Sequence, residues 1–150
     1  MATSCSKYNI GLRNTTTQLV PVGGLISMGG TYRNFSRVIN GIDTFRADGE
    51  SLRLQQQGIY LITATLIGTG TEAGDLTAQV LENGEPITVL ATETITTPDT
   101  EVHTLTINYL AKVDNSCIMG CNVTVGKTIT LQNIGVEATY TYVGLTAVKL

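Results

Sequence analysis

The sequence has few charged and few aromatic side chains. Asp, Glu, Lys and Arg make up 14% of its 150 residues, Trp is absent and there are two Phe, whereas about 25% of the residues in an average globular domain are charged. So little charge indicates a surface that is rich in Thr, Ser, Asn and Gly, or one that other chains partly cover. A chain of this length is expected to form one domain with a hydrophobic core of its own.

Histidine is nearly absent, and this removes the usual arrangements for acid–base catalysis. Ser–His–Asp and Cys–His sites need a histidine, and the only one is His103, in the segment EVHTLTINYL. On a strand, His103 shares a face with Leu105 and Ile107, so we interpret it as a strand-end or interface residue. The alternative is a ring of three His103 side chains that holds a metal on a threefold axis. We therefore expect no catalytic residues, no metal site, no cofactor and no enzymatic activity.

The three cysteines do not suggest a disulfide framework, because their number is odd. Cys117 and Cys121 could share a metal or a disulfide on a helix or in a tight loop, but on an extended strand they would lie too far apart to bond. We interpret them as small buried hydrophobic residues. No apolar run approaches the ~20 residues that span a bilayer, and no secretory leader opens the chain, so neither a membrane nor secretion is expected.

Strand and turn signals dominate the chain. Thr, Val, Ile and Tyr are frequent, no apolar stripe persists at helical spacing, and turn residues recur every ~8 to 15 positions, as in an antiparallel sandwich or barrel. Asn83-Gly84 predicts a type I′ hairpin. About ten strands are expected, at residues 18–27, 32–38, 51–55, 59–69, 76–82, 87–94, 101–113, 122–125, 127–132 and 139–150.

The segment GIYLITATLIGTG, residues 58–70, is apolar on both faces if it is a strand. One face carries Tyr60, Ile62, Ala64 and Leu66, and the other carries Ile59, Leu61, Thr63, Thr65 and Ile67. Monomers rarely expose such strips, since removing apolar surface from water is favourable by about 25 cal/mol per Å². Both faces are therefore expected to be dry, either within one thick monomer or with one face against other chains.

Basic residues are concentrated in the first third of the chain. Residues 1–57 contain six basic and three acidic residues, whereas residues 58–150 contain three basic and nine acidic ones. This asymmetry indicates docking to an acidic partner, with chance clustering as the alternative. Few aromatic residues lie between the basic residues, so nucleic acid is not an expected partner. Residues 1–17 show poor periodicity and are expected to form a flexible arm that a partner could order.

Four segments together resemble a known family. They are YRNFSRVING, then GESLRLQQQGIYLITATLIGTG, then LTAQVLENGEPI, and finally the terminal YVGLTAVKL. In this order and spacing they resemble the jelly-roll family shared by the recognition heads of the first complement component and the tumour necrosis factor ligands. The match looks closest to its bacterial and phage versions and covers about residues 32–150. The low aromatic content departs from the animal members, so their receptor binding is not carried over.

The resemblance implies an all-β fold, a ten-stranded antiparallel jelly-roll sandwich that forms a homotrimer and carries an N-terminal arm. Residues 1–31 would be the arm and a first strand used for docking, and residues 32–150 the trimerisation domain. In that family one face of the central strands fills the sandwich and the other meets the sister chains. The expected trimer-interface residues are Tyr60, Ile62, Leu66, Tyr109, Tyr140 and Tyr142.

The expected function is that of a non-enzymatic virion structural protein. It would be a trimeric capsid decoration protein on the capsid exterior, assembled in the host bacterial cytoplasm, that binds the major capsid protein and stabilises the head. The protein could also bind weakly to the host surface. The alternative is the receptor-binding or adhesive head of a phage fibre or a bacterial surface protein. The residues expected to dock on the capsid are Lys7, Arg13, Leu19, Val20, Arg33 and Arg37.

Overall fold

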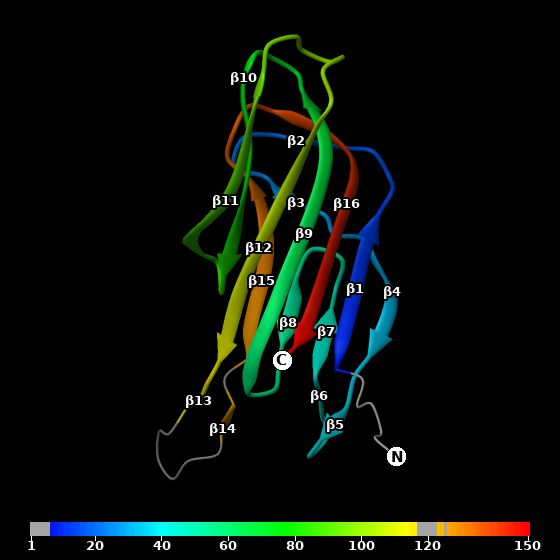
Figure 1. Cartoon of the computed structure of the whole chain (residues 1–150), viewed down its shortest axis with the longest axis vertical. Helices are drawn as coiled ribbons and strands as arrows, with labels where there is room; N and C mark the ends of the chain where they lie inside the picture. Colours follow the sequence, from blue (N-terminus) through cyan, green and yellow to red (C-terminus); the bar gives the residue numbers. More distant parts are fainter. Residues whose placement is uncertain (1–6, 117–122, 125) are drawn as a thin grey trace, which may run out of the picture.

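The computed structural model describes residues 7–116, 123–124 and 126–150. Within these ranges every element is a strand, and the strands of both main sheets pair antiparallel, so the predicted all-β antiparallel fold is confirmed. The described residues contain no helix long and apolar enough to cross a membrane. The strands form two main sheets, which run side by side along the long axis of the molecule (Figure 1).

The first sheet contains the doubly apolar segment. Its strand order is β12-β9-β16-β1-β4, and β2 pairs with β16 on the side opposite β9, the side on which β1 also lies. Neighbours in the sheet are mostly distant in sequence, as in jelly-roll sandwiches. The bounds are β1 (Asn9–Asn14), β2 (Gln18–Val20), β4 (Gly30–Phe35), β9 (Gly58–Gly70), β12 (His103–Val113) and β16 (Ala138–Lys149).

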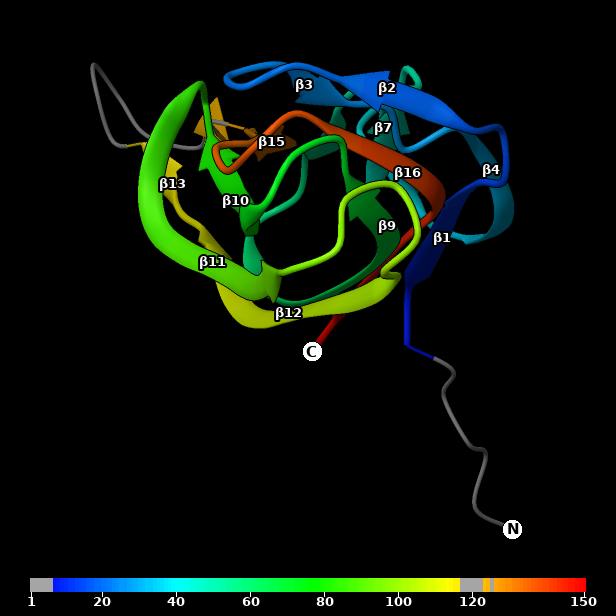
Figure 2. The same ribbon diagram turned by 90° about the horizontal axis from the view of Figure 1, so that it is seen from above.

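The second sheet has the order β11-β10-β15-β8-β7, with β3 paired to β15. Seen from above, the two sheets curve around a common interior (Figure 2). The hairpins β5–β6 and β13–β14 extend from one end of the sandwich (Figure 1). The bounds are β3 (Leu25–Ile26), β5 (Val38–Ile39), β6 (Ile42–Asp43), β7 (Phe45–Ala47), β8 (Leu52–Leu54), β10 (Gly74–Glu82), β11 (Glu85–Ile95), β13 (Asn115–Ser116), β14 (Val123–Thr124) and β15 (Lys127–Asn133).

The core lies between the sheets and is built from alternate residues of their strands. Tyr60, Ile62 and Leu66 of β9 are completely buried and belong to the same cluster as Leu52 and Leu54 of β8. Each such aliphatic side chain contributes about 1.5–3 kcal/mol when it leaves water. The Tyr60 hydroxyl donates a hydrogen bond to the Gln56 carbonyl oxygen (2.6 Å), so the ring is buried without an unpaired polar group.

Residues 9–31 belong to the sandwich, which corrects the expectation of an arm reaching residue 17 and of a domain boundary after residue 31. Strand β1 lies between β16 and β4, and its Ile10 and Leu12 are buried in the core. The boundary expected after residue 31 falls within β4. Strand β1 was missed because its partner β16 is about 130 residues away, and such pairing leaves little local signal.

Turns divide the chain into more and shorter strands than the ten expected. The expected strand at residues 18–27 is two strands, β2 in the first sheet and β3 in the second, because the turn around Gly23 (φ +84°) separates them. The predicted hairpin at Asn83-Gly84 is confirmed, since both residues have positive φ, +52° and +81°, as a type I′ turn requires.

Candidate interaction surfaces

The outward face of β12, β9 and β16 carries no charged side chain along most of its length. Alternation along each strand sends every second residue away from the core. Ile59, Leu61 and Leu110 on this face are 44%, 37% and 61% exposed. Among the outward-facing positions of these three strands, Lys112 alone is charged, and it lies opposite Ile59 at one end of the face. The uncharged residues of this outer face are Ile59, Leu61, Thr63, Thr65, Ile67, Thr104, Thr106, Asn108, Leu110, Tyr142, Gly144, Thr146 and Val148.

The polar side chains of the outer face make no hydrogen bonds within the described chain. Thr65 lies opposite both Thr106 and Gly144, and Thr63 lies opposite both Asn108 and Thr146, so hydroxyl and amide groups form continuous rows. None of these groups is hydrogen-bonded to another described residue. Their donors and acceptors are therefore left for water or for another chain.

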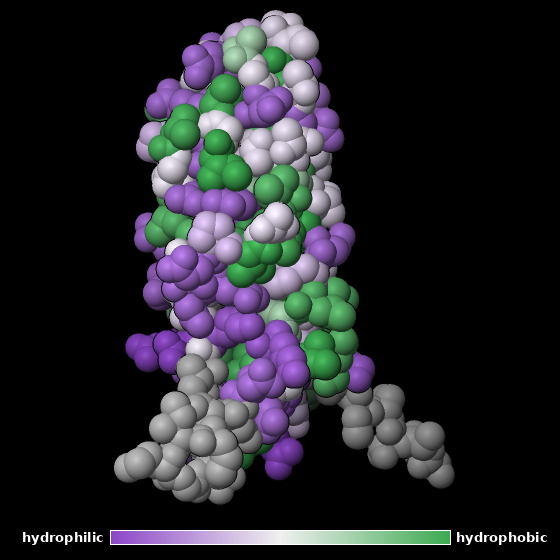
Figure 3. All heavy atoms as spheres, turned by 90° about the vertical axis from the view of Figure 1, so that its left-hand side faces the viewer, coloured by the Kyte–Doolittle hydropathy of each residue, from purple (hydrophilic) through white to green (hydrophobic). Residues whose placement is uncertain are grey.

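The outer face is low in relief at its centre. A side chain at Gly144 would come within 2.7 Å of the Tyr142 hydroxyl, so the Tyr142 ring lies across this glycine. The adjoining β11–β12 side of the molecule, seen in Figure 3, combines apolar with hydrophilic residues, and Leu90, Val102 and Leu110 are well exposed there. A flat, largely uncharged surface beside exposed apolar residues is suited to contact with another protein.

Four of the six expected trimer-interface residues point into the core instead, and this part of the prediction is corrected. Tyr60, Ile62, Leu66 and Tyr140 have 0% exposure within one chain, so they have no surface to offer a sister chain. The prediction assigned the larger apolar side chains to the trimer interface, whereas these side chains are buried in the interior of the sandwich. The threonines on the opposite face of β9 were the informative signal, because a fully buried core face rarely carries so many hydroxyl groups.

The other two expected interface residues have different surroundings. Tyr109 also faces inward, is half-buried, and donates a hydrogen bond to Glu82 Oε2 (3.1 Å). Burial, and then the nearby Glu82 carboxylate, raise the pKa of Tyr109. Tyr142 alone lies on the outer face, following an irregularity in the β9–β16 pairing between Tyr140 and Tyr142. Tyr142 is thus the single expected residue that remains available at this surface.

Two of the expected docking residues, Arg13 and Arg33, lie together at the β1–β4 side of the first sheet. The guanidinium groups of Arg13 and Arg33 lie 4.7 Å and 5.7 Å from the centre of the Tyr32 ring. Tyr32 is 47% exposed, Arg13 and Arg33 are exposed, and β4 is the exposed edge strand of its sheet. Two cations on one aromatic ring make a basic surface of defined shape.

The remaining expected docking residues are more scattered. Lys7 and Arg37 are exposed, and Leu19 is 60% exposed, whereas Val20 is 3% exposed and packs in the core. Val20 is therefore corrected to a core residue, because alternation in β2 turns it inward when Leu19 points outward. The structure does not bring these side chains into one patch with Arg13.

The hairpin β5–β6 presents apolar residues that the sequence analysis did not single out. Val38, Ile39 and Ile42 are 62%, 42% and 47% exposed around the Asn40-Gly41 turn. The buried Gln56 holds the base of the hairpin, since its Nε2 donates to the carbonyl oxygens of Arg37 (2.6 Å) and Ile42 (3.2 Å). An exposed apolar tip on a hydrogen-bonded base is a defined contact element, and the NG turn between apolar residues was its sequence signal.

His103 lies on the inward-facing side of β12 and pairs with carboxylates. Its Nε2 is 2.8 Å from Glu101 Oε1, and its Nδ1 is 3.9 Å from Glu93. This places it away from the outer face. Among the residues that the structure describes, no group of three His, Cys, Asp or Glu could hold a metal. Cys117 and Cys121 lie outside the described residues.

Comparison with solved structures identifies the fold. A tumour necrosis factor protein, Eiger from S. frugiperda, aligns with a TM-score of 0.65 at 9% identity, over 96% of this chain and 93% of that one. The globular domain of the zebrafish complement 1qA protein aligns with a TM-score of 0.61 at 8% identity, over 94% and 95%. Murine APRIL at pH 5.0 aligns with a TM-score of 0.55 at 17% identity, over 95% and 99%.

These similarities confirm the jelly-roll fold of the complement and tumour necrosis factor type. The identities are too low to show more than the fold. No family model matches the sequence, and no curated protein matches it. Function therefore has to be argued from the surfaces described above.

Proposed function

We propose that this protein is a non-enzymatic structural protein that assembles as a homotrimer through the outer face, and that the trimer decorates the exterior of a virion capsid. The observation that carries the proposal is the outer face itself, which has apolar side chains, unpaired hydroxyl groups and no charge over most of three strands. The centres of protein interfaces are depleted in charge in the same way.

A ring of three copies suits this surface. Contacts around a threefold axis join two different patches of neighbouring subunits, and the ring closes without leaving a patch exposed. The outer face would supply one patch, and the adjoining β11–β12 edge, with Leu90 and Val102 exposed, would supply the other. Association would make the second face of β9 dry, which is what the doubly apolar sequence of this strand leads us to expect.

Sedimentation of the purified protein tests the assembly. A trimer of 16.0 kDa chains sediments as a particle of about 48 kDa, and Thr65→Arg at the centre of the outer face should convert it into monomers. The arginine would be buried without a partner in each copy, at a cost of at least roughly 2 kcal/mol per chain. Thr130→Arg, the same change at an outward position of β15 in the second sheet, is the matched control and should leave the trimer intact.

The proposed capsid contact uses the basic β1–β4 side and the apolar β5–β6 hairpin. Arg13 and Arg33 on Tyr32 would meet acidic groups of the major capsid protein, and Val38, Ile39 and Ile42 would supply apolar contacts. Three copies bind together in a trimer, so modest single contacts give a strong attachment. Tying neighbouring capsid subunits together in this way would stabilise the head.

Rebinding to capsids that lack the protein tests the docking. The double variant Arg13→Glu with Arg33→Glu should lose binding while it remains trimeric, and Arg46→Glu, the same charge reversal on the second sheet, should bind normally. Normal binding by the double variant would contradict the proposed contact. Deleting residues 2–17 is not a clean test, because it removes β1 from the middle of the first sheet.

The alternative function, a receptor-binding or adhesive head, is favoured by one ordered loop. Between β11 and β12, Glu101 Oε2 accepts hydrogen bonds from the backbone N–H groups of Thr96 and Thr97, both at 2.7 Å, and from the Thr96 hydroxyl (2.8 Å). A loop held in shape at the end of a trimer could contact a host molecule. Binding to host cells or to a glycan array, with none to capsids, would favour this function over decoration.

A further inference from the structure

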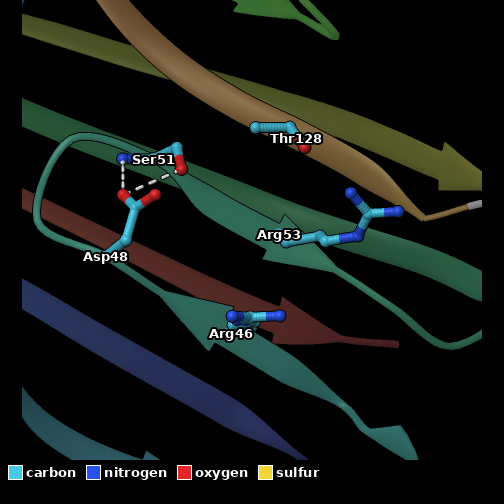
Figure 4. A pocket seen from close by; sticks show the side chains of 5 residues that line it. All are labelled: Arg46, Asp48, Ser51, Arg53 and Thr128. Atoms are coloured by element: carbon cyan, nitrogen blue, oxygen red, sulfur yellow. Dashed lines mark hydrogen bonds between the residues drawn. The ribbon is translucent and has the colours of Figure 1, made fainter.

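A hollow of about 230 Å³ lies on the outward side of the second sheet. Its walls are Arg46 of β7, Arg53 of β8, Thr128 of β15, and Asp48 and Ser51 in the β7–β8 turn (Figure 4). Sequence analysis did not single out these residues. We refer to this site as the arginine hollow.

The strand register places the two arginines side by side. Arg46 is directly opposite Arg53, and Arg53 is directly opposite Thr128, so the three residues form one row across three strands. Phe45, Leu52 and Leu54 are buried, which turns this row toward the outside. Like charges directly opposite each other on neighbouring strands destabilise a sheet. The arrangement therefore favours a negatively charged group beside the two guanidinium groups.

The chain supplies that group only in part. Asp48 is the nearest carboxylate in the hollow, but its Oδ1 already accepts hydrogen bonds from Ser51 N–H (2.8 Å), Ser51 Oγ (2.9 Å) and Glu50 N–H (3.1 Å). The hydrogen bonds from Ser51 are the largest cause of the lowered pKa of Asp48, and the Arg46 charge is the smallest. In the described part of the chain, the ion pairs involve His103, Lys112 and Lys127, and neither arginine takes part in one.

Arg53 packs against the backbone of a neighbouring glycine. A side chain at residue 126 would come within 2.7 Å of Arg53 Nε, which shows that the arginine lies across the backbone of Gly126. Lys127, the next residue, pairs with Glu82 at 3.2 Å and is thereby withdrawn from the hollow.

We propose that the arginine hollow binds a tetrahedral oxyanion, a phosphate group that is either free or carried on a small ester. Guanidinium groups donate pairs of parallel hydrogen bonds to such oxygens, and the Thr128 hydroxyl adds a third donor from a third strand. A tetrahedral ion presents more acceptor oxygens to donors from three strands than a carboxylate does. The bound anion also relieves the repulsion between the two arginines.

Titration with inorganic phosphate at constant ionic strength, followed by calorimetry and by NMR, tests the site. We expect saturable binding of one ion per chain with a dissociation constant on the order of 1 mM or tighter, as two charge-assisted contacts would give. Arg53→Gln and Arg46→Gln should each weaken binding by about 10-fold or more. Arg33→Gln, which removes an exposed arginine of the first sheet, is the matched control and should bind as the wild type does.

Further anions define the ligand. Sulfate should bind like phosphate, and acetate should bind at least about 10-fold more weakly because it lacks the third acceptor. Glucose 6-phosphate distinguishes a phosphate ester from free phosphate as the ligand. Its binding supports a site for esters, and its exclusion supports a site for the free ion. No saturation by phosphate, equal binding of acetate, or unchanged affinity in both Arg46→Gln and Arg53→Gln would overturn the proposal. The test depends on the fold of one chain, so failure of the trimer proposal would leave it unaffected.

Discussion

The outward faces of the two sheets differ in whether their polar side chains are hydrogen-bonded to one another. On the second sheet, side chains pair with each other, since Gln79 Nε2 donates to Gln132 Oε1 (2.7 Å) and the hydroxyls of Thr77 and Thr92 are 3.0 Å apart. The same sheet carries the exposed Arg46 and Arg53. The outer face, on β12, β9 and β16 of the first sheet, has a single charge, Lys112 at one end, and no hydrogen bonds between its own described side chains.

This difference distinguishes a surface suited to water from one suited to a protein partner. Charges and internally paired amides keep a sheet soluble, and they make it costly to bury against another chain. Unpaired hydroxyl groups and aliphatic side chains are compatible with burial once a partner offers hydrogen bonds. The proposed trimer is therefore supported by the difference in charge and in hydrogen bonding between the two faces. Hydrophobicity alone does not support it, because the hydrophobicity of both faces is modest.

The largest expected effect compares the two sides of β9. Leu66→Ala removes a completely buried side chain and should lower the free energy of unfolding by about 3 kcal/mol, because it leaves a cavity. Leu61→Ala, on the opposite side and 37% exposed, should leave monomer stability within about 0.5 kcal/mol. Urea unfolding at protein concentrations too low for association measures both values. A loss of similar size in Leu61→Ala would mean that this side of β9 already lies within the core of one chain.

A smaller effect is expected on the second sheet. Gln79→Ala leaves Gln132 without its partner and should cost about 1 kcal/mol, since both groups lie at a largely buried part of the sheet surface. The loss should not depend on protein concentration, whereas substitutions in the outer face of the first sheet should. Concentration-dependent unfolding of Gln79→Ala would show that association extends from the β11–β12 edge onto β10 of the second sheet.

The smallest effect concerns the loop that joins β11 of the second sheet to β12 of the first. Hydrogen bonds, first from Thr97 N–H and then from His103 and Thr96, lower the pKa of Glu101 from 4.5 to about 2. Because the folded-state pKa is depressed, the carboxylate supports the loop fully above pH about 4.5, and this support is lost as the pH falls through about 2.

NMR measures this effect directly. The amide shifts of Thr96 and Thr97 should titrate with a midpoint near pH 2, and Glu101→Gln should abolish that titration. A midpoint at the ordinary glutamate value would mean that the hydrogen bonds do not persist in solution. Both faces should be unaffected, since the exposed loop lies at the end of the sandwich (Figure 1).

Much of the fold was predictable where the signal is local. The alternation in residues 58–70 and 101–113 and the Asn83-Gly84 turn predicted β9, β12 and the β10–β11 hairpin close to where they occur. Strand β1 could not be predicted in this way, because Ile10 and Leu12 become a core pair only through pairing with β16. The row of Arg46, Arg53 and Thr128 was equally hidden, since it depends on register between strands.

The amino-acid sequence by itself determined that this protein is built from strands. It also determined that β9 would have two sides unlike those of an ordinary surface strand. Both follow from side-chain alternation and turn chemistry, which act over a few residues. Only the tertiary structure decided which side of β9 became the core and which stayed open, and which arginines came together. Those choices depend on pairing between segments as far apart as β1 and β16, and on a close-packed interior that takes Tyr60 and Leu66 and leaves the threonines outside.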